Sequence, residues 1–352
     1  MLLMALSNGK GISRTFGVVL VAIAYVVLSI LINYLISDAS MISTDYPIKI
    51  LFNIVMFYAL AQNIKNRHIS GETIYRILNN NAYVIIFCIV VPYMLDLGHT
   101  IYSGGIGYKG FYYSQNELNA ALIILFFFSL YKLNKKMTLL SLFQVGGLLV
   151  CILLMSTKSS LIACAIGVGV YVFEYIRKEN SRKKTIMIGV LAICIFAVSG
   201  FVISKIMDMF ARQSSLLSTY DGSLLATITS GRIYTLEDAW QQLVNSDNVV
   251  LNAILGNGFF SSYLIEMDFF DVFFYLGIIG IIGIIAFLVY ICIKSQNNLK
   301  KDKNIIRIAG FIVILAFAFV TGHVLFMATS GCYFILYCIF IIKYNFNDTY
   351  SN

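Results

Sequence analysis

Ten apolar stretches, each close to the length of a membrane-spanning helix, follow one another along this chain. A helix needs about 20 apolar residues to cross the hydrocarbon core of a bilayer. The chain has two prolines, Pro47 and Pro92, so these helices are expected to run unbroken. We therefore predict an all-α integral membrane protein with about ten transmembrane helices, at residues 16–36, 47–63, 81–97, 118–133, 138–155, 159–176, 184–205, 271–293, 305–324 and 328–344.

The positive charges predict how these helices cross the membrane. Of the 25 lysines and arginines, 19 lie near the two termini or in every second loop, and the alternate loops hold the other six. Cytoplasmic loops carry the excess of basic residues in membrane proteins. Both termini are therefore predicted to be cytoplasmic, which requires an even number of spans. This distribution also accounts for the net charge of +8 without nucleic-acid binding.

Residues 205–270 are the one long polar stretch, with seven predicted spans before it and three after it. We predict a single polytopic membrane domain, 1–352, with 205–270 as a large extracytoplasmic loop between the seventh and eighth helices. Five apolar residues recur in this loop at helical spacing. They predict an amphipathic helix on the membrane or against the bundle, formed by Ile233, Leu236, Trp240, Leu243 and Val244.

Arg232, at the start of this amphipathic helix, is the first candidate for chemistry. Either Ser230 caps the helix, or Thr235 and Asp238 form a capping box that leaves Arg232 just before it. In both cases a guanidinium lies at a helix N-terminus, which suits a phosphate group. The alternative is a surface arginine paired with Glu237 or Asp238.

Arg212 and Lys158 are weaker candidates for binding a phosphate. For Arg212, the alternative is an arginine that snorkels to the membrane interface. Lys158 lies in a serine-rich turn between two predicted helices, so snorkelling or a structural turn explains it equally well.

Three acidic residues, Glu266, Asp268 and Asp271, lie at the outer mouth of the eighth predicted span. Carboxylates near a membrane are costly to bury and tend to be functional. One of them is a candidate general base for a sugar hydroxyl. The alternative is a solvated helix entrance, where the helix dipole favours acids.

Ser114 and Glu117 predict a capping box at the start of the fourth span. In the functional alternative, Tyr112, Tyr113 and Asn116 form a cluster that faces a sugar.

The remaining patterns favour structural roles. All seven cysteines fall inside apolar stretches without CxxC spacing, so neither a disulfide nor a metal site is predicted. A stripe of small residues in the eighth span predicts close helix packing: Gly277, Gly280 and Gly283.

These elements, in this order, resemble the O-antigen ligase and polysaccharide polymerase family. Five segments between about 105 and 285 carry the likeness: a Gly-Phe…Asn opening at 110–117, the serine-rich turn at 156–160, a Gly-Arg…Trp motif at 231–240, a Gly-x-Gly turn at 256–258, and the stretch 266–280 that leads into a Gly-x-x-Gly span. Two positions depart from the pattern. Many relatives have His-Asn at the positions of Glu266 and Met267. Relatives also often have an arginine at the position of Lys158, and a lysine there can contact a phosphate but not in a bidentate way.

The resemblance implies a GT-C-like, metal-independent membrane glycosyltransferase without a cofactor. Its donor would be an oligosaccharide on a polyprenyl diphosphate, at the outer face of the cytoplasmic (inner) membrane of a bacterium. The other expected partners are the lipid bilayer, a flippase and a chain-length regulator. The implied site residues are, for the diphosphate, Arg232, Arg212 and Lys158; for the acceptor proton, Glu266 or Asp268; and for the sugar, Asn116 and Tyr113.

Three functions fit this resemblance to different degrees. The first is a polymerase that joins repeat units into a capsular, exopolysaccharide or O-antigen polymer. The second is a ligase that moves finished glycan to a lipid or wall acceptor. The third is a transporter or flippase, which would carry ionisable groups at mid-bilayer and broken helices, and neither feature is predicted here.

Overall fold

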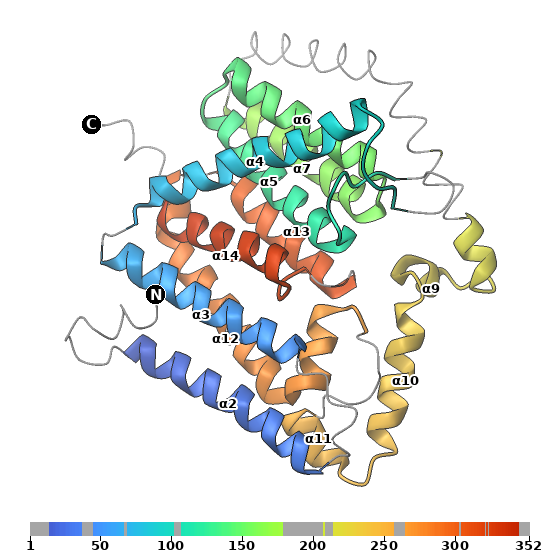
Figure 1. The fold of residues 1–352 in the computed structure, drawn as a ribbon. Helices are drawn as coiled ribbons and strands as arrows, with labels where there is room; N and C mark the ends of the chain where they lie inside the picture. Colours follow the sequence, from blue (N-terminus) through green and yellow to red (C-terminus); the bar gives the residue numbers. More distant parts are fainter. Residues whose placement is uncertain are drawn as a thin grey trace. The chain divides into compact units, whose positions relative to one another are not determined.

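The computed structural model describes residues 14–36, 45–66, 69–101, 107–178, 207, 214–256, 265–302, 304–320, 322 and 324–344. Within these ranges the chain is helical, apart from turns and one isolated bridge between Thr100 and Tyr108. The helices in Figure 1 are α2 (Arg14–Ile36), α3 (Asp45–Lys65), α4 (Gly71–Met94), α5 (Gln115–Lys135), α6 (Leu139–Met155), α7 (Lys158–Lys178), α9 (Leu224–Thr229), α10 (Arg232–Val244), α11 (Val249–Leu255), α12 (Asp268–Asp302), α13 (Ile306–Val320) and α14 (Ala328–Lys343).

The helices confirm a multi-pass membrane protein. Five of the described helices are long and apolar enough to cross a bilayer, namely α3, α4, α5, α7 and α12. Four more apolar segments, Phe16–Ile32 within α2 and the shorter helices α6, α13 and α14, coincide with four more of the predicted spans. The predicted span 184–205 lies outside the described residues, so the total of ten stays a prediction.

The chain divides into two compact units that interleave along the sequence. Unit 1 comprises Met1–Ile74, Ile228–Asn298 and Ala316–Tyr344. Unit 2 comprises Tyr75–Thr227, Leu299–Leu315 and Asn345–Asn352. That the two units make up one membrane domain stays a prediction.

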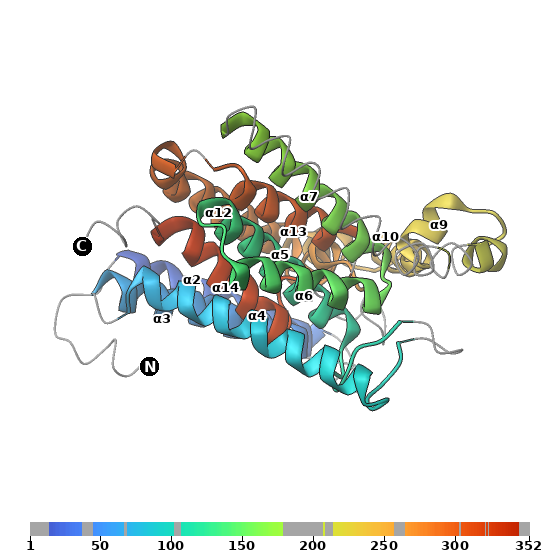
Figure 2. The same ribbon diagram turned by 90° about the horizontal axis from the view of Figure 1, so that it is seen from above.

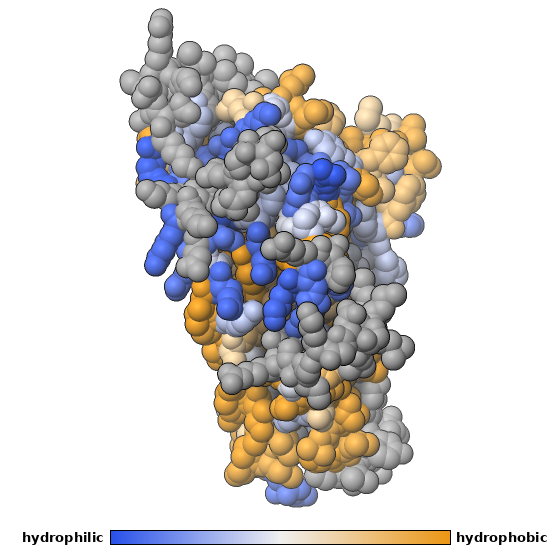
Figure 3. Space-filling model, turned by 90° about the vertical axis from the view of Figure 1, so that its left-hand side faces the viewer, coloured by the Kyte–Doolittle hydropathy of each residue, from blue (hydrophilic) through white to orange (hydrophobic). Residues whose placement is uncertain are grey.

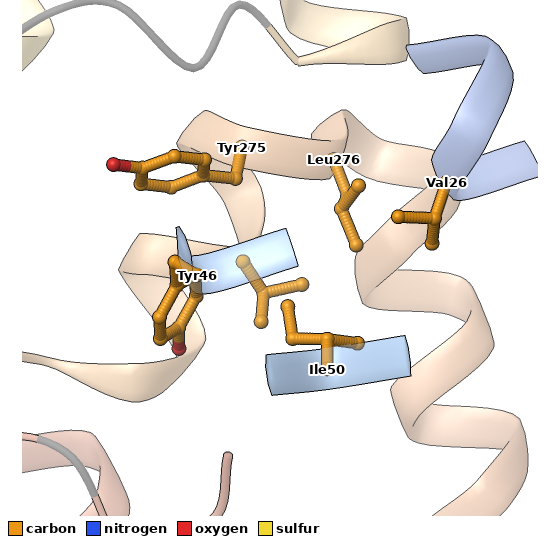
Figure 4. Packing of buried hydrophobic residues seen from close by; sticks show 6 residues of the cluster. Val26, Tyr46, Ile50, Tyr275 and Leu276 are labelled. Atoms are coloured by element: carbon orange, nitrogen blue, oxygen red, sulfur yellow. The ribbon is translucent and has the colours of Figure 1, made fainter. Parts of the chain in front are cut away.

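Unit 1 is built on contacts between α2, α3, α12 and α14. Helix α3 packs against both α2 and α14. Its core brings together residues from α2, α3 and α12, which Figure 4 shows at close range: Val26, Tyr46, Ile50, Val272, Tyr275 and Leu276. Burial of these apolar side chains stabilises the unit by the usual hydrophobic and packing contributions.

Helix α12 is broken at Gly277, contrary to the expectation of unbroken spans. Gly277 has φ 60° and ψ −166°, a region that is essentially reserved for glycine. A Cβ at this position would also clash with the carbonyl group of Ile254, at the end of α11. In the predicted glycine stripe, therefore, Gly277 makes a close approach to another helix. Gly280 contacts side chains of its own helix, and Gly283 has open space around it.

Unit 2 is built around α5, which is buried along most of its length. It packs against both α6 and α7, and Figure 2 shows these green helices side by side. Ser114 caps α5 by accepting a hydrogen bond from the backbone N–H of Glu117, which confirms the predicted helix start. Helix α6 begins with a full capping box between Thr138 and Ser141.

The predicted amphipathic helix of the polar loop is α10. Its residues Ala239 and Leu243 are buried in a cluster with Ile265, Met267 and Phe274, while Trp240 stacks on Phe273. One face of α10 therefore packs against the bundle of unit 1. Figure 3 shows hydrophobic residues gathered over the lower part of the face in view, with hydrophilic residues above them.

Candidate functional site

Arg232 is the first residue of α10, and two residues in left-handed conformation precede it. Ser230 has φ 54° and Gly231 has φ 83°. Gly231 occupies the N-cap position and provides no side-chain cap. Both predicted capping schemes are therefore wrong, although Arg232 does lie at the helix N-terminus. The backbone N–H of Ile233 donates instead to the Thr229 hydroxyl, at 3.4 Å.

The guanidinium of Arg232 is paired with Glu266, which lies 34 residues further along the chain. Its Nη2 and Nε atoms donate to the same oxygen, Glu266 Oε2, at 2.7 and 3.2 Å. Its Nη1 donates to the carbonyl oxygen of Thr229 at 3.2 Å. Arg232 therefore pairs with Glu266, and not with Glu237 or Asp238, the partners expected for a surface arginine. The pair joins the start of α10 to the mouth of α12.

The two members of this pair differ in exposure. The Arg232 side chain is 17% exposed, whereas that of Glu266 is 44% exposed. An ion pair that is partly screened from water is stronger than a fully exposed one. The Glu266 carboxylate nevertheless stays accessible to a ligand.

The backbone at Glu266 is held in an unusual conformation by its surroundings. Its φ is 62°, in the left-handed region that non-glycine residues seldom adopt. The carboxylate of Asp271 accepts hydrogen bonds from the N–H groups on both sides of it, Ile265 at 2.9 Å and Met267 at 3.0 Å. Gly322 packs so closely on Glu266 that a Cβ there would clash. These contacts fix the direction in which the Glu266 side chain leaves the backbone.

Asp268 is fully buried and serves as a structural tie. Its Oδ2 accepts hydrogen bonds from the backbone N–H groups of Val324 and Leu325, at 2.7 and 2.8 Å. Its Oδ1 accepts one from the Tyr46 hydroxyl at 3.3 Å. These bonds join the start of α12 to the start of α3 and to the segment that leads into α14. Among the predicted acids, Glu266 is thus the one whose carboxylate can reach a ligand.

Lys158 lies in unit 2, at the first position of α7. Its Nζ donates to the carbonyl oxygen of Thr227 at 2.8 Å. This hydrogen bond connects the start of α7 to helix α9 in the polar loop. Beside it, the turn residues Thr157 and Ser159 bond to Asn119 of α5, at 3.2 and 2.5 Å. The structure therefore gives this turn a supporting role, and a phosphate contact by Lys158 stays a prediction.

Tyr113 and Asn116 also lie in unit 2, before and within the first turn of α5. The Tyr113 ring is almost fully exposed, and Lys109 donates to its backbone carbonyl at 2.9 Å. Asn119, one turn further on, escaped the sequence analysis although an amide inside an apolar span is itself a signal. The placement of Arg212 lies outside the described residues. Whether residues of the two units act together stays a prediction.

Sequence reasoning placed Arg232 and Glu266 in one site, but it did not predict their direct ion pair. Asp271 was named with the acids, yet its role in holding the backbone at 265–267 could not be read from the chain. Tyr46 and Gly322 carried no signal at all, because their partners lie more than 50 residues away.

The comparisons with known proteins support the predicted resemblance. A family model described as "O-antigen ligase like membrane protein" matches residues 213–345. The match includes the paired Arg232 and Glu266 and the broken helix α12, but it does not reach the segments 110–117 and 156–160. No curated protein matches the chain. Over residues 213–345, this chain is similar to O-antigen ligase-like membrane proteins.

Proposed function

We propose that this protein polymerises oligosaccharide repeat units carried on a polyprenyl diphosphate, at the outer face of the bacterial cytoplasmic membrane. The observation that carries the proposal is the ion pair between Arg232 and Glu266 at the mouth of α12. It lies within the segment that matches the O-antigen ligase-like family. It also combines the two groups that glycosyl transfer from a diphosphate needs, a cation for the leaving group and a base for the acceptor.

In the proposed reaction, the acceptor hydroxyl oxygen attacks the anomeric carbon of the donor sugar. The bond from that carbon to the diphosphate oxygen breaks, and polyprenyl diphosphate leaves with the bonding electrons. Arg232 stabilises the negative charge that develops on the leaving group. Glu266 takes the proton from the acceptor hydroxyl. No metal or cofactor enters this scheme.

The ion pair itself has a role in the proposed scheme. A diphosphate carries more negative charge than a carboxylate and presents several oxygens to the guanidinium fork. Donor binding would therefore displace Glu266 from Arg232. The released carboxylate then becomes available as a base only when the donor is in place.

The basic residues at the helix ends of unit 1 support the proposed orientation of the protein in the membrane. The start of α12, the start of α3 and the segment leading into α14 meet at Asp268. The opposite ends of these three helices carry Lys294, Lys65 and Lys343. Basic residues thus mark the side away from the candidate site, as expected if that side is cytoplasmic.

The test compares Arg232→Ala, Arg232→Lys and Glu266→Gln with the matched control Glu237→Gln, which alters an exposed acid on the same helix α10. In a strain that lacks the natural protein, Glu266→Gln should lower polymer formation by on the order of 10²–10⁴-fold. Arg232→Ala should leave single repeat units on the lipid, and Arg232→Lys should recover a part of the activity. The control should make polymer of normal length.

The glycan profile also separates the alternative function. A ligase defect would leave long polymer on the lipid carrier, whereas a polymerase defect leaves single units. Normal chain length in both Arg232→Ala and Glu266→Gln would remove the pair from the reaction.

A further inference from the structure

The end of helix α11 lies beside the middle of helix α2. The carbonyl oxygen of Leu255 accepts a hydrogen bond from Ser29 at 3.1 Å, and the Tyr25 hydroxyl lies 3.4 Å from it. Tyr25 is the central residue of α2, which runs from Arg14 to Ile36. At 1.5 Å per residue it lies about 16 Å from either end of the helix. Figure 1 shows α11 against the C-terminal half of α2.

A second helix gives a similar depth for the same segment. Gly256, which follows α11, packs so tightly on Tyr275 and Leu276 of α12 that a Cβ would clash with their backbone. Gly277 in turn leaves no room for a Cβ next to Ile254. Gly277 lies nine residues beyond the start of α12, or about 13 Å along it. With the start of α12 at the membrane surface, this contact would lie well inside the hydrocarbon core, which is about 30 Å thick.

Two hydroxyl groups of α2 donate to backbone carbonyl groups at this contact. Gly277 interrupts the helical dihedral angles of α12 directly after Tyr275 and Leu276. Tyr25 donates to Leu276 at 2.5 Å, and Ser29 lies 3.4 Å from the oxygen of Tyr275. In water these bonds would be dispensable, but an unsatisfied backbone group in the hydrocarbon region costs several kcal/mol.

The side chains of α11 are apolar and turned outward. The helix has the sequence Val-Val-Leu-Asn-Ala-Ile-Leu without a charge. Val250 is 73% exposed, and Leu251 and Ile254 are 40% and 41% exposed. Its one polar side chain, Asn252, donates to Ser246 at 3.1 Å. An uncharged helix with outward apolar side chains at this depth fits lipid acyl chains and no aqueous partner.

We infer that α11 is a re-entrant helix: part of the polar loop turns back into the same half of the bilayer and contacts lipid acyl chains. The loop is then held at the membrane in addition to its covalent links to the spanning helices. This inference does not depend on the proposed reaction.

Depth-dependent quenching of tryptophan fluorescence tests it, because Trp240 is the single tryptophan of the chain. Trp240→Phe provides the background, into which Val250→Trp or Ile254→Trp is introduced. The full protein is reconstituted into phosphatidylcholine vesicles. In vesicles whose acyl chains are brominated, both variants should lose most of their fluorescence, whereas iodide in the surrounding buffer should have little effect.

The matched control is Asp247→Trp, which lies three residues before Val250 in an exposed turn. It should be quenched by iodide and be insensitive to bromine deep in the acyl chains. Iodide quenching of both Val250→Trp and Ile254→Trp, at the level of the control, would overturn the inference. The use of two positions on α11 guards against a local disturbance at one of them.

Discussion

Asp268 and Asp271 both lie buried in the first turn of α12, but the two carboxylates use their oxygens differently. In Asp268, one oxygen accepts both backbone N–H groups and the other accepts a hydroxyl. In Asp271, each oxygen accepts one backbone N–H group. An asparagine at Asp268 can keep both backbone bonds if its NH₂ group donates to the Tyr46 hydroxyl, whereas at Asp271 the NH₂ group must face a backbone N–H group. We expect Asp271→Asn to destabilise the protein by about 1–3 kcal/mol, and Asp268→Asn by clearly less.

The measurement is thermal unfolding of the two variants and the parent protein in the same detergent. Because Asp271 holds the backbone on both sides of Glu266, Asp271→Asn should also reduce polymer formation in cells that contain normal amounts of the protein. A melting temperature of Asp271→Asn equal to that of the parent protein would show that the hydrogen bonds at 265–267 do not contribute to stability.

At the scale of a helix, α12 allows a comparison between two glycines that look alike in the sequence. Gly277→Ala places a side chain in a glycine-only conformation, which costs on the order of 1–3 kcal/mol, and against the backbone of Ile254. Gly283→Ala meets nothing within 4 Å, and alanine favours the helix by up to about 1 kcal/mol. The melting temperature should fall clearly for Gly277→Ala and be unchanged or higher for Gly283→Ala. A similar change in both would mean that the break in α12 contributes little to stability.

These helices also show what the sequence could predict and what it could not. The span predicted at 118–133 is observed as Gln115–Lys135, because apolar length is a local property of the chain. The break at Gly277 was not predictable, because it depends on the carbonyl group of Ile254, which a distant segment supplies. The same reason applies to the site. Arg232 and Glu266 stood out by residue type, but their pairing depends on how α10 packs against α12.

At the scale of the whole molecule, the basic residues make a prediction about orientation. In unit 1, the starts of α3 and α12 carry Asp45, Asp268 and Asp271, and the opposite ends of α3, α12 and α14 carry Lys65, Lys294 and Lys343. Since basic residues are retained in the cytoplasm, α11 and the candidate site should face outward. We expect an epitope inserted at Asp247 to bind antibody on spheroplasts, and an epitope after Asn352 to bind only after the membrane is permeabilised. Antibody access to the second epitope alone on intact spheroplasts would reverse the orientation. It would also place Arg232 and Glu266 on the cytoplasmic side, where a donor that has already been flipped outward could not reach them.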